Sequence, residues 1–142
     1  MKIMAIDYGD AHTGIAISDY TETLAGYSDT IHSRRQEEVL SGIQRLIAEH
    51  GVQLLVLGYP RNMDGTEGER ARKSRKLAKT VEIWSGLPVR MWDERQTTCA
   101  AADLLDESGT FGSRRQEILD SVSATVILDD YLAWRKEHPG EI

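Results

Sequence analysis

The sequence predicts an α/β fold in which helices pack on a mixed β-sheet. Three observations support this prediction. The chain opens with β-favouring segments spaced closely enough for hairpins, it continues with segments that alternate between helix and strand, and its apolar residues follow the matching periodicities. With 142 residues we expect one domain over positions 1–142, in which residues 138–142 fray.

The first three predicted strands lie near the N-terminus. Residues 2–7 read as a buried strand, and the turn-rich segment 8–12 separates it from a second β-favouring run at 13–18. The short spacing predicts an antiparallel hairpin. Residues 25–31 add a third strand, with a weaker pattern because it contains glycine and serine.

A helix and a fourth strand follow. Ser33 and Gln36 form a capping-box signature before an apolar 3.6-residue repeat, and Gly51 is expected to end that helix. The continuous apolar run 54–57 is typical of a strand that is covered on both faces. The order of these segments predicts a helix that returns the chain to the sheet.

The second half of the chain repeats this alternation. Thr66 and Glu69 suggest another capping box, Gly86 is expected to end the helix, and residues 89–92 form the fifth predicted strand. The remaining segments are predicted as a helix at 97–108, a loop at 109–113 and a long helix at 116–135.

Composition narrows the classes of protein. Cys99 is the only cysteine, which excludes an internal disulfide and a zinc site built from cysteines. No apolar run approaches the ~20 residues of a membrane span and no leader-like segment opens the chain, so we expect a cytoplasmic protein with no membrane partner. The net charge of −6 argues against strong nonspecific binding to nucleic acid.

Asp7 is unusual because it extends a buried strand in register with Ile3 and Ala5. Burying a lone carboxylate costs several kcal/mol, on the order of its lost hydration, unless a cation or hydrogen-bond donors compensate. The sequence therefore predicts a partner for Asp7.

Two further acidic positions suggest that the partner is a metal ion. Glu94 follows the fifth strand beside Asp93, and Asp120 begins the apolar stripe of the last helix. That stripe contains Ala124, Ile127, Leu128, Tyr131 and Trp134. Considered singly, Asp120 also reads as a first-turn carboxylate and Asp93 and Glu94 as a surface pair. Together, three carboxylates offer the oxygen ligands that Mg²⁺ prefers.

Four motifs carry a resemblance to a known family. They are residues 5–9 (AIDYG), 58–68 (GYPRNMDGTEG), 92–98 (WDERQTT) and 119–124 (LDSVSA). In this order and spacing they resemble the YqgF family of the ribonuclease H-like superfamily. That family comprises Holliday junction resolvases that are also described as nucleases processing the 5′ end of pre-16S rRNA. The resemblance covers nearly the whole chain.

The resemblance implies a five-stranded sheet of order 3-2-1-4-5 in which strand 2 is antiparallel to the others. It assigns Asp7, Glu94 and Asp120 as catalytic and metal-binding residues, with Asp93 as a supporting or alternative ligand. The implied cofactor is Mg²⁺ or Mn²⁺, expected as two ions. The implied reaction is endonucleolytic hydrolysis of phosphodiester bonds in structured RNA (pre-16S rRNA) or, alternatively, in branched four-way DNA junctions.

Nucleic-acid contacts are expected near this site. Between positions 61 and 79 seven basic residues stand against three acidic ones, and we assign Arg61, Asn62, Lys73 and Lys76 to binding together with Arg95. A solvated helix face, turn formation and ion pairing are the alternative interpretations. The opposite side of this helix is expected to be buried, through Leu77, Val81 and Trp84.

Three departures from the family pattern affect the substrate contacts. His12 stands where a basic residue usually follows the first turn, and Tyr59 and Arg61 replace common apolar residues. His12 also has the chemistry of a general base or a phosphate contact, although a loop histidine usually has neither role.

Two other classes compete with the nuclease. Actin-like and sugar-kinase ATPases also begin with a strand, an aspartate and a glycine-containing hairpin, but they need two such domains around the nucleotide. A non-catalytic nucleic-acid or ribosome-assembly factor would retain the fold without cleavage. The oligomeric state stays open between a monomer and a homodimer, since a resolvase needs two symmetric cuts.

Overall fold

A computed structural model describes the backbone of residues 1–62, 64–93 and 113–142, and the side chains of these residues apart from 113–121. A five-stranded sheet forms its centre, in the order β3-β2-β1-β4-β5. The strands are β1 (Lys2–Asp7), β2 (His12–Ser18), β3 (Ala25–His32), β4 (Val52–Tyr59) and β5 (Val89–Asp93). β1, β2 and β3 pair antiparallel, whereas β4 is parallel to β1 and β5 is parallel to β4. The predicted fold class and strand order are confirmed.

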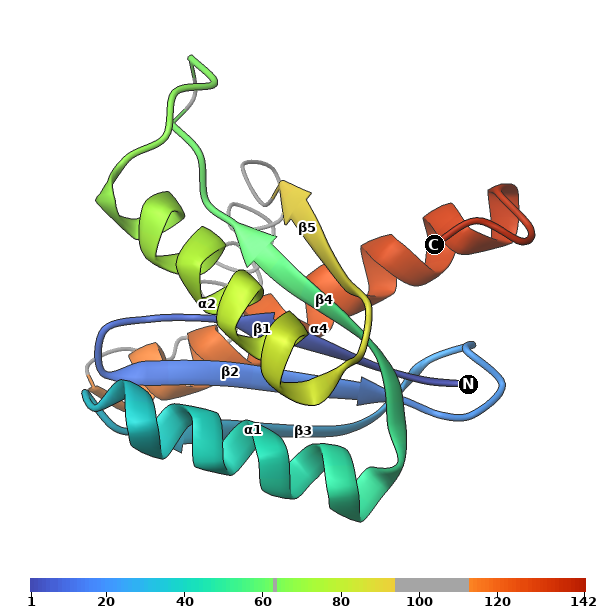
Figure 1. Cartoon of the computed structure of the whole chain (residues 1–142), viewed down its shortest axis with the longest axis horizontal. Coiled ribbons are helices and arrows are strands. Elements are labelled where there is room, and N and C mark those ends of the chain that lie inside the picture. Colours follow the sequence, from blue (N-terminus) through green and yellow to red (C-terminus); the bar gives the residue numbers. More distant parts are fainter. Residues whose placement is uncertain (63, 94–112) are drawn as a thin grey trace.

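Helices cover both faces of the sheet (Figure 1). The helices α1 (Gln36–His50) and α2 (Glu69–Ser85) lie on one face, and α4 (Ser113–Glu137) crosses the other face. None of the described helices is long and apolar enough to cross a membrane. The predicted helix at 97–108 and the predicted loop residues 109–112 lie outside the described residues.

Alternation along β1 divides the buried residues into two clusters. Met4 and Ile6 face α1 and α2, whereas Ile3 and Ala5 face α4. The first cluster also contains Ile15, Ile17, Val39, Ile43, Leu46, Leu55, Leu57, Leu77 and Val81, and the second contains Ala16, Leu54, Val56, Ala124, Ile127, Leu128, Tyr131 and Leu132. Each buried Leu or Ile side chain contributes about 1.5–3 kcal/mol to folding. The central strands therefore hold both layers together.

Glycine ends two helices as predicted. Gly51 follows α1 with φ 67° and Gly86 follows α2 with φ 70°, both in the left-handed region that side chains with a Cβ avoid. The Gly51 amide donates to the Ile47 carbonyl and the Gly86 amide to the Glu82 carbonyl. These bonds satisfy carbonyls that would otherwise lack a partner at the helix end.

The predicted capping box of Ser33 and Gln36 is wrong. α1 begins at Gln36, its N-cap residue is Arg35, and no side chain caps it. Ser33 Oγ instead accepts a hydrogen bond from the Arg35 amide and donates to Glu38 Oε2. Ser33 thus shapes the turn that precedes the helix, two residues too early to act as its cap.

The predicted capping box of Thr66 and Glu69 is also wrong. α2 begins at Glu69 with Gly68 as its N-cap residue. Thr66 Oγ1 and the Thr66 amide both donate to Asp64 Oδ1, at 2.6 and 2.9 Å. The hydroxyl therefore serves the loop before the helix, because a threonine side chain that bonds to its own loop is not available to cap the helix.

Trp84 corrects the predicted buried stripe of α2. Leu77 and Val81 are buried as expected, but Trp84 is 42% exposed. The stripe instead contains Ala71, Ser74, Leu77, Ala78 and Val81. Trp84 shares its helix side with Leu77 but lies in the last turn, where the helix ends at Ser85 and covers less of a large ring.

Candidate active site at the end of strand β1

Asp7 is the last residue of β1 and only 4% of its surface is exposed. It pairs in register with Gly14 of β2, and alternation puts its side chain on the face that α4 covers, with Ile3 and Ala5. A carboxylate in this position is stable only with compensating cations or donors. The burial predicted for this residue is therefore present, and its charge needs a partner.

Arg70 provides one such partner. Its Nη2 atom lies 3.3 Å from Asp7 Oδ1, and 49% of the Arg70 side chain is exposed against 5% of the Asp7 side chain. Arg70 stands in the first turn of α2, directly before buried Ala71, so its side chain extends from α2 to the end of β1. The sequence interpretation did not assign Arg70 to the site. The sequence signal that could have identified Arg70 is its position in the first turn of a predicted helix, directly before apolar Ala71.

The other two predicted carboxylates are described less fully. Asp120 belongs to α4, one helical turn before buried Ala124, and Glu94 lies outside the described residues. Figure 1 shows α4 running behind the sheet from the end at which β1 terminates. Helix α4, which carries position 120, therefore covers the face of the sheet on which Asp7 lies.

Within the described residues, no group of three or more histidine, cysteine, aspartate or glutamate side chains could hold a metal ion. Of the three predicted catalytic carboxylates, only Asp7 has a described side chain, since the Asp120 side chain and Glu94 lie outside that set. The donor chemistry fits a hard divalent cation, because carboxylate oxygens are the ligands that Mg²⁺ and Mn²⁺ prefer. A buried carboxylate at a strand end is also where such an ion would offset the loss of hydration.

Asp93 ends β5 and forms an ion pair with Arg61, Nη2 to Oδ2 at 3.6 Å. Its neighbour Trp92 packs on the α4 side, so alternation directs Asp93 toward the face opposite to that of Asp7. The Arg61 guanidinium also lies 5.7 Å from the centre of the Tyr59 ring. Arg61 therefore joins the ends of β4 and β5, in addition to its predicted role in binding. Arg95 lies outside the described residues.

Asn62 has a structural role in the loop after β4. Its amide nitrogen Nδ2 donates to Thr66 Oγ1 at 3.0 Å, and its backbone amide donates to the Thr66 carbonyl at 2.9 Å. The side chain is exposed, so its predicted contact with nucleic acid stays a prediction.

Glu67 ties this loop to α2 and to β4. It accepts hydrogen bonds from Arg75 Nε at 2.8 Å and from the Tyr59 hydroxyl at 2.6 Å. The Arg75 hydrogen bond, followed by that of Tyr59, lowers the pKa of the Glu67 carboxyl from 4.5 to about 2. The hydrogen bond that the Tyr59 hydroxyl donates to Glu67 raises the pKa of the Tyr59 phenol above its usual 10.0. The loop beside the site is thus held by a charged contact at neutral pH.

Lys73 and Lys76 are both exposed on α2, as predicted. Lys73 Nζ lies 3.2 Å from Asp10 Oδ1 in the turn after β1 and 3.5 Å from Glu69 Oε1. Hydrogen bonding to Asp10 raises the pKa of the Lys73 ammonium. Basic residues of α2 therefore reach the end of β1 at two points, through Arg70 and through Lys73.

His12 opens β2 opposite His32 of β3, and the two Nδ1 atoms are 3.0 Å apart. The rings meet edge to face with centroids 5.1 Å apart. His12 lies two residues from Gly14 along β2, so it shares the α4 face with Asp7. Its structural partner is an exposed histidine, which sequence spacing alone did not reveal.

The sheet order, helices on both faces and a buried aspartate at the end of the central strand define the ribonuclease H-like class. Among solved structures, the Thermus thermophilus RuvC in complex with a Holliday junction substrate has the same fold. The similarity has a TM-score of 0.57 at 11% identity and covers 96% of each chain.

The family follows from the sequence comparison. The model described as "RuvX: Holliday junction resolvase" matches residues 1–134, and the chain belongs to this family. The resemblance to the YqgF family is thereby confirmed. The names of the family and of the relatives place the chain among the nucleases, hydrolases that act on phosphodiester bonds.

Curated relatives match over nearly their full length. A protein of Halothermothrix orenii is 36% identical over 140 residues, covering 99% of this chain and 100% of the relative. A protein of Symbiobacterium thermophilum is 38% identical over 141 residues, covering 99% and 98%. Both carry the name "Putative pre-16S rRNA nuclease".

Proposed function

We propose that this protein is a metal-dependent endonuclease that processes the 5′ end of pre-16S rRNA. The observation that carries the proposal is Asp7, a carboxylate with 4% exposure at the end of the central strand of a chain that belongs to a nuclease family. The substrate is taken from the names of relatives that match 99% of the chain. Glu94 and Asp120 complete the proposed carboxylate set.

The reaction is hydrolysis. Water attacks phosphorus, the bond to the 3′ oxygen breaks, and the products carry a 5′ phosphate and a 3′ hydroxyl that has taken up the proton. When bound, two Mg²⁺ or Mn²⁺ ions would supply the Lewis acidity that neutralises charge on the phosphate. Asp7, Glu94 and Asp120 would provide the oxygen ligands, with Asp93 as a supporting or alternative one.

Arg70 has a defined part in this scheme. Its guanidinium lies 3.3 Å from Asp7, half exposed, and so a phosphate that approaches Asp7 meets an arginine with free donor capacity. Since the guanidinium keeps its charge at all working pH values, it would orient the phosphate without any proton transfer. Arg61, Asn62, Arg95, Lys73 and Lys76 would contact the nucleic acid around it.

A four-way DNA junction is the second candidate substrate, because the matching family is described as resolvases and the fold is that of RuvC. Two symmetric cuts would require a homodimer with a two-fold axis, whereas trimming one RNA strand does not. A non-catalytic assembly factor is the third candidate. It would bind RNA equally well with and without divalent ions.

A side-by-side assay tests these proposals. A pre-16S rRNA 5′ segment and a four-way junction are incubated with the protein in Mg²⁺, in Mn²⁺ and in excess chelator, while light scattering gives the mass in solution. We expect RNA cleavage that requires the ions and is lost in Asp7→Asn. Cleavage of the junction alone by a dimer would favour the resolvase, and RNA binding without cleavage in any ion would favour the assembly factor.

Two further expectations stay proposals. Residues 1–142 would form one domain, since both clusters of buried residues share the same sheet. A single cooperative unfolding transition would support this, and two separate transitions would contradict it. The cytoplasmic location inferred from the sequence also stays a prediction, which fluorescence microscopy of the tagged protein would test.

A further inference from the structure

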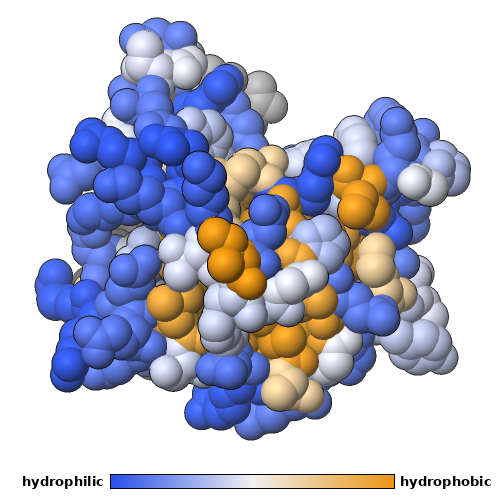
Figure 2. All heavy atoms as spheres, in the orientation of Figure 1, coloured by the Kyte–Doolittle hydropathy of each residue, from blue (hydrophilic) through white to orange (hydrophobic). Residues whose placement is uncertain are grey.

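A small pocket lies beside the end of β1, between the beginnings of α1 and α2. Its volume is about 240 Å³. The residues that line it are Tyr8, Asp10, Arg34, Gln36, Lys73 and Lys76. Figure 2 shows this side of the molecule, where hydrophilic residues cover the area in which both helices begin and hydrophobic residues gather nearer its centre.

The residues that line the pocket carry more positive than negative charge. Three cations face one carboxylate, and that carboxylate, Asp10, already pairs with Lys73 at 3.2 Å. In the part of the chain that the structure describes, no carboxylate pairs with Arg34 or with Lys76. The protein as a whole has a net charge of −6, so this concentration of unpaired positive charge is local. An anion is the ligand that such a pocket favours.

Helix α1 adds to this preference. It begins at Gln36, a residue of the pocket, and no side chain caps its first amides. Amides at the start of a helix point outward and carry partial positive charge, which favours a bound anion. This contribution is secondary to the two unpaired cations, because the first turn also holds Glu37 and Glu38.

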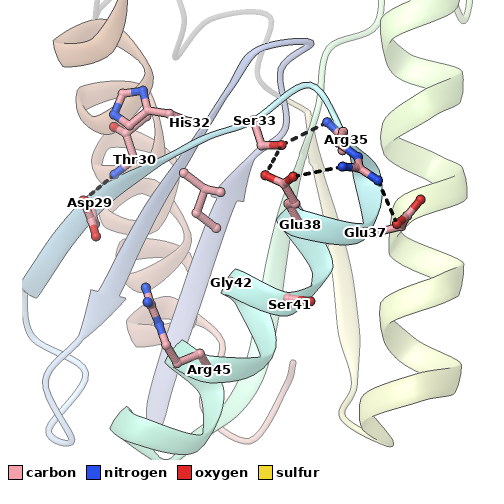
Figure 3. Close-up of a pocket in the computed structure, with 11 residues that line it drawn as sticks. Asp29, Thr30, His32, Ser33, Arg35, Glu37, Glu38, Ser41, Gly42 and Arg45 are labelled. Carbon is pink, nitrogen blue, oxygen red and sulfur yellow. Dashed lines mark hydrogen bonds and ion pairs between the residues drawn. The ribbon is translucent and has the colours of Figure 1, made fainter.

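In a neighbouring groove, by contrast, carboxylates balance the charge of the lining residue Arg35 (Figure 3). The groove lies between β3 and α1 and has a volume of about 730 Å³. Its Arg35 pairs with Glu37 and Glu38 at 3.6 Å each, and Ser33 donates to Glu38. The acids of the first turn of α1 are thus paired with Arg35. The larger groove therefore has the weaker preference for an anion.

The pocket is adjacent to the proposed catalytic residue. Tyr8 follows Asp7 directly, and Lys73 stands three residues after Arg70, which contacts Asp7. Residues three apart on a helix lie about 5–6 Å from each other at Cβ. Tyr8 packs with the cluster under α1 and α2, whereas Asp7 faces α4, so the pocket and the catalytic carboxylate flank the same strand end.

We propose that this pocket binds a backbone phosphate of the nucleic acid, next to the phosphate that is cleaved at Asp7. The proposal rests on the proposed function. Arg34 and Lys76 supply the charge, the amide end of α1 supplies donors, and Lys73 exchanges part of its contact with Asp10 for the phosphate. The strand would pass from Asp7 across the end of the sheet, with Arg70 between the two positions.

Salt dependence of binding tests the pocket. Labelled single-stranded RNA and DNA of the same sequence are titrated with protein in chelator, which prevents cleavage, between about 50 and 200 mM salt. For Arg34→Ala and for Lys76→Ala we expect weaker binding and a log–log salt slope reduced by up to about 0.7, the value for the loss of one phosphate contact on a single strand. The matched controls are Arg35→Ala and Lys79→Ala, neighbours that do not line the pocket, and both should keep the slope of the unmodified protein.

A chemically modified strand gives the second readout. A methylphosphonate that replaces one phosphate removes a single charge, and moving it along the strand should reveal one position at which the unmodified protein loses affinity. The double variant Arg34→Ala/Lys76→Ala should be insensitive at that position and sensitive elsewhere. Equal sensitivity of this variant at every position would overturn the proposal. Agreement between the RNA and DNA arms would mean that the pocket recognises the phosphate alone, and a loss confined to RNA would assign it to the ribosomal substrate.

Different results would overturn the catalytic assignment of Asp7 and the proposed phosphate pocket. If Asp7→Asn still cleaves while the slopes change as expected, the catalytic assignment is wrong and the pocket stands. If Asp7→Asn is inactive while Arg34→Ala and Lys76→Ala behave like their controls, the nuclease stands and the pocket is wrong.

Discussion

Arg70 Nη2 and Asp7 Oδ1 lie 3.3 Å apart although 63 positions separate the residues in the chain. The pair joins the first turn of α2 to the end of β1. It places a half-exposed guanidinium against a carboxylate that is almost fully buried, so the charge of Asp7 is balanced from the solvent side.

Replacing Asp7 with asparagine should separate stability from activity. Asn keeps the shape of the side chain and removes a buried charge, so the free energy of unfolding should change by less than about 1 kcal/mol or rise. Cleavage should fall at least about 100-fold, because an essential oxygen ligand is lost. Chemical denaturation and a cleavage assay on one preparation give both values. Cleavage within a few-fold of the original would contradict the assignment of Asp7.

Substitutions of Arg70 should reveal how its contact acts. Arg70→Ala leaves the Asp7 charge with less compensation and is expected to lower both stability, by about 1–3 kcal/mol, and activity. Arg70→Lys keeps the charge but loses the planar fork, so stability should recover more than activity. Arg72→Ala on the exposed side of the same helix is the control. Equal stability and activity of Arg70→Ala and Arg72→Ala would show that the contact between Arg70 and Asp7 contributes to neither.

Gly9 should not tolerate a side chain. A Cβ atom at this position would lie 2.4 Å from the His12 carbonyl oxygen, a backbone atom that cannot move aside easily. Gly9→Ala should destabilise the protein by about 1–3 kcal/mol and displace the turn after Asp7. The matched control is Gly26→Ala, where the nearest atom would lie at 3.8 Å. Thermal unfolding of the two variants tests the difference, and equal melting temperatures would show that the turn adapts.

Acid should loosen the loop that Glu67 holds. Its pKa falls from 4.5 to about 2 on folding, so its contacts stabilise the protein fully above pH 4.5 and are lost as the pH falls toward 2. The stability difference between the unmodified protein and Glu67→Gln should therefore shrink across this interval. Glu82→Gln, at an exposed position on α2, is the control. A difference that stays constant from pH 5 to pH 2 would contradict the assigned cause.

Ser74 should be replaceable with a gain in stability. It is fully buried in α2, and its hydroxyl has no hydrogen-bond partner among the described residues. Ser74→Ala removes that cost and inserts the best helix former, so unfolding should become harder by about 1 kcal/mol. Ser85→Ala should have the opposite effect, since Ser85 Oγ donates to the Val81 carbonyl at 2.6 Å. Urea titrations compare the two. A destabilised Ser74→Ala would mean that its hydroxyl has a partner.

Sequence reasoning predicted the elements most reliably where one local rule decides. The strand β1 and the helix ends at Gly51 and Gly86 follow from apolar periodicity and from the backbone freedom of glycine. The stripe of α4 from Ala124 to Tyr131 is also buried as predicted. Helix starts were predicted less well, because Ser33 and Thr66 had nearer partners in their own loops.

The order of the strands in the sheet was predicted from a family resemblance. Apolar periodicity shows which face of a strand is buried, but it does not show which strand lies beside it. The same limit applied to the candidate site. Asp7 stood out because a charge in a buried strand is costly, and this cost can be read from the sequence.

The sequence by itself thus determined that position 7 needs compensation and that it belongs to a nuclease-like pattern. Only the tertiary structure decided that Arg70 lies against Asp7, that His12 meets His32, and that Arg34 and Lys76 share a pocket. The physical reason is the distance along the chain over which each effect acts. Propensity and burial act on neighbours along the chain, whereas a contact between charges depends on where packed strands and helices bring distant residues together.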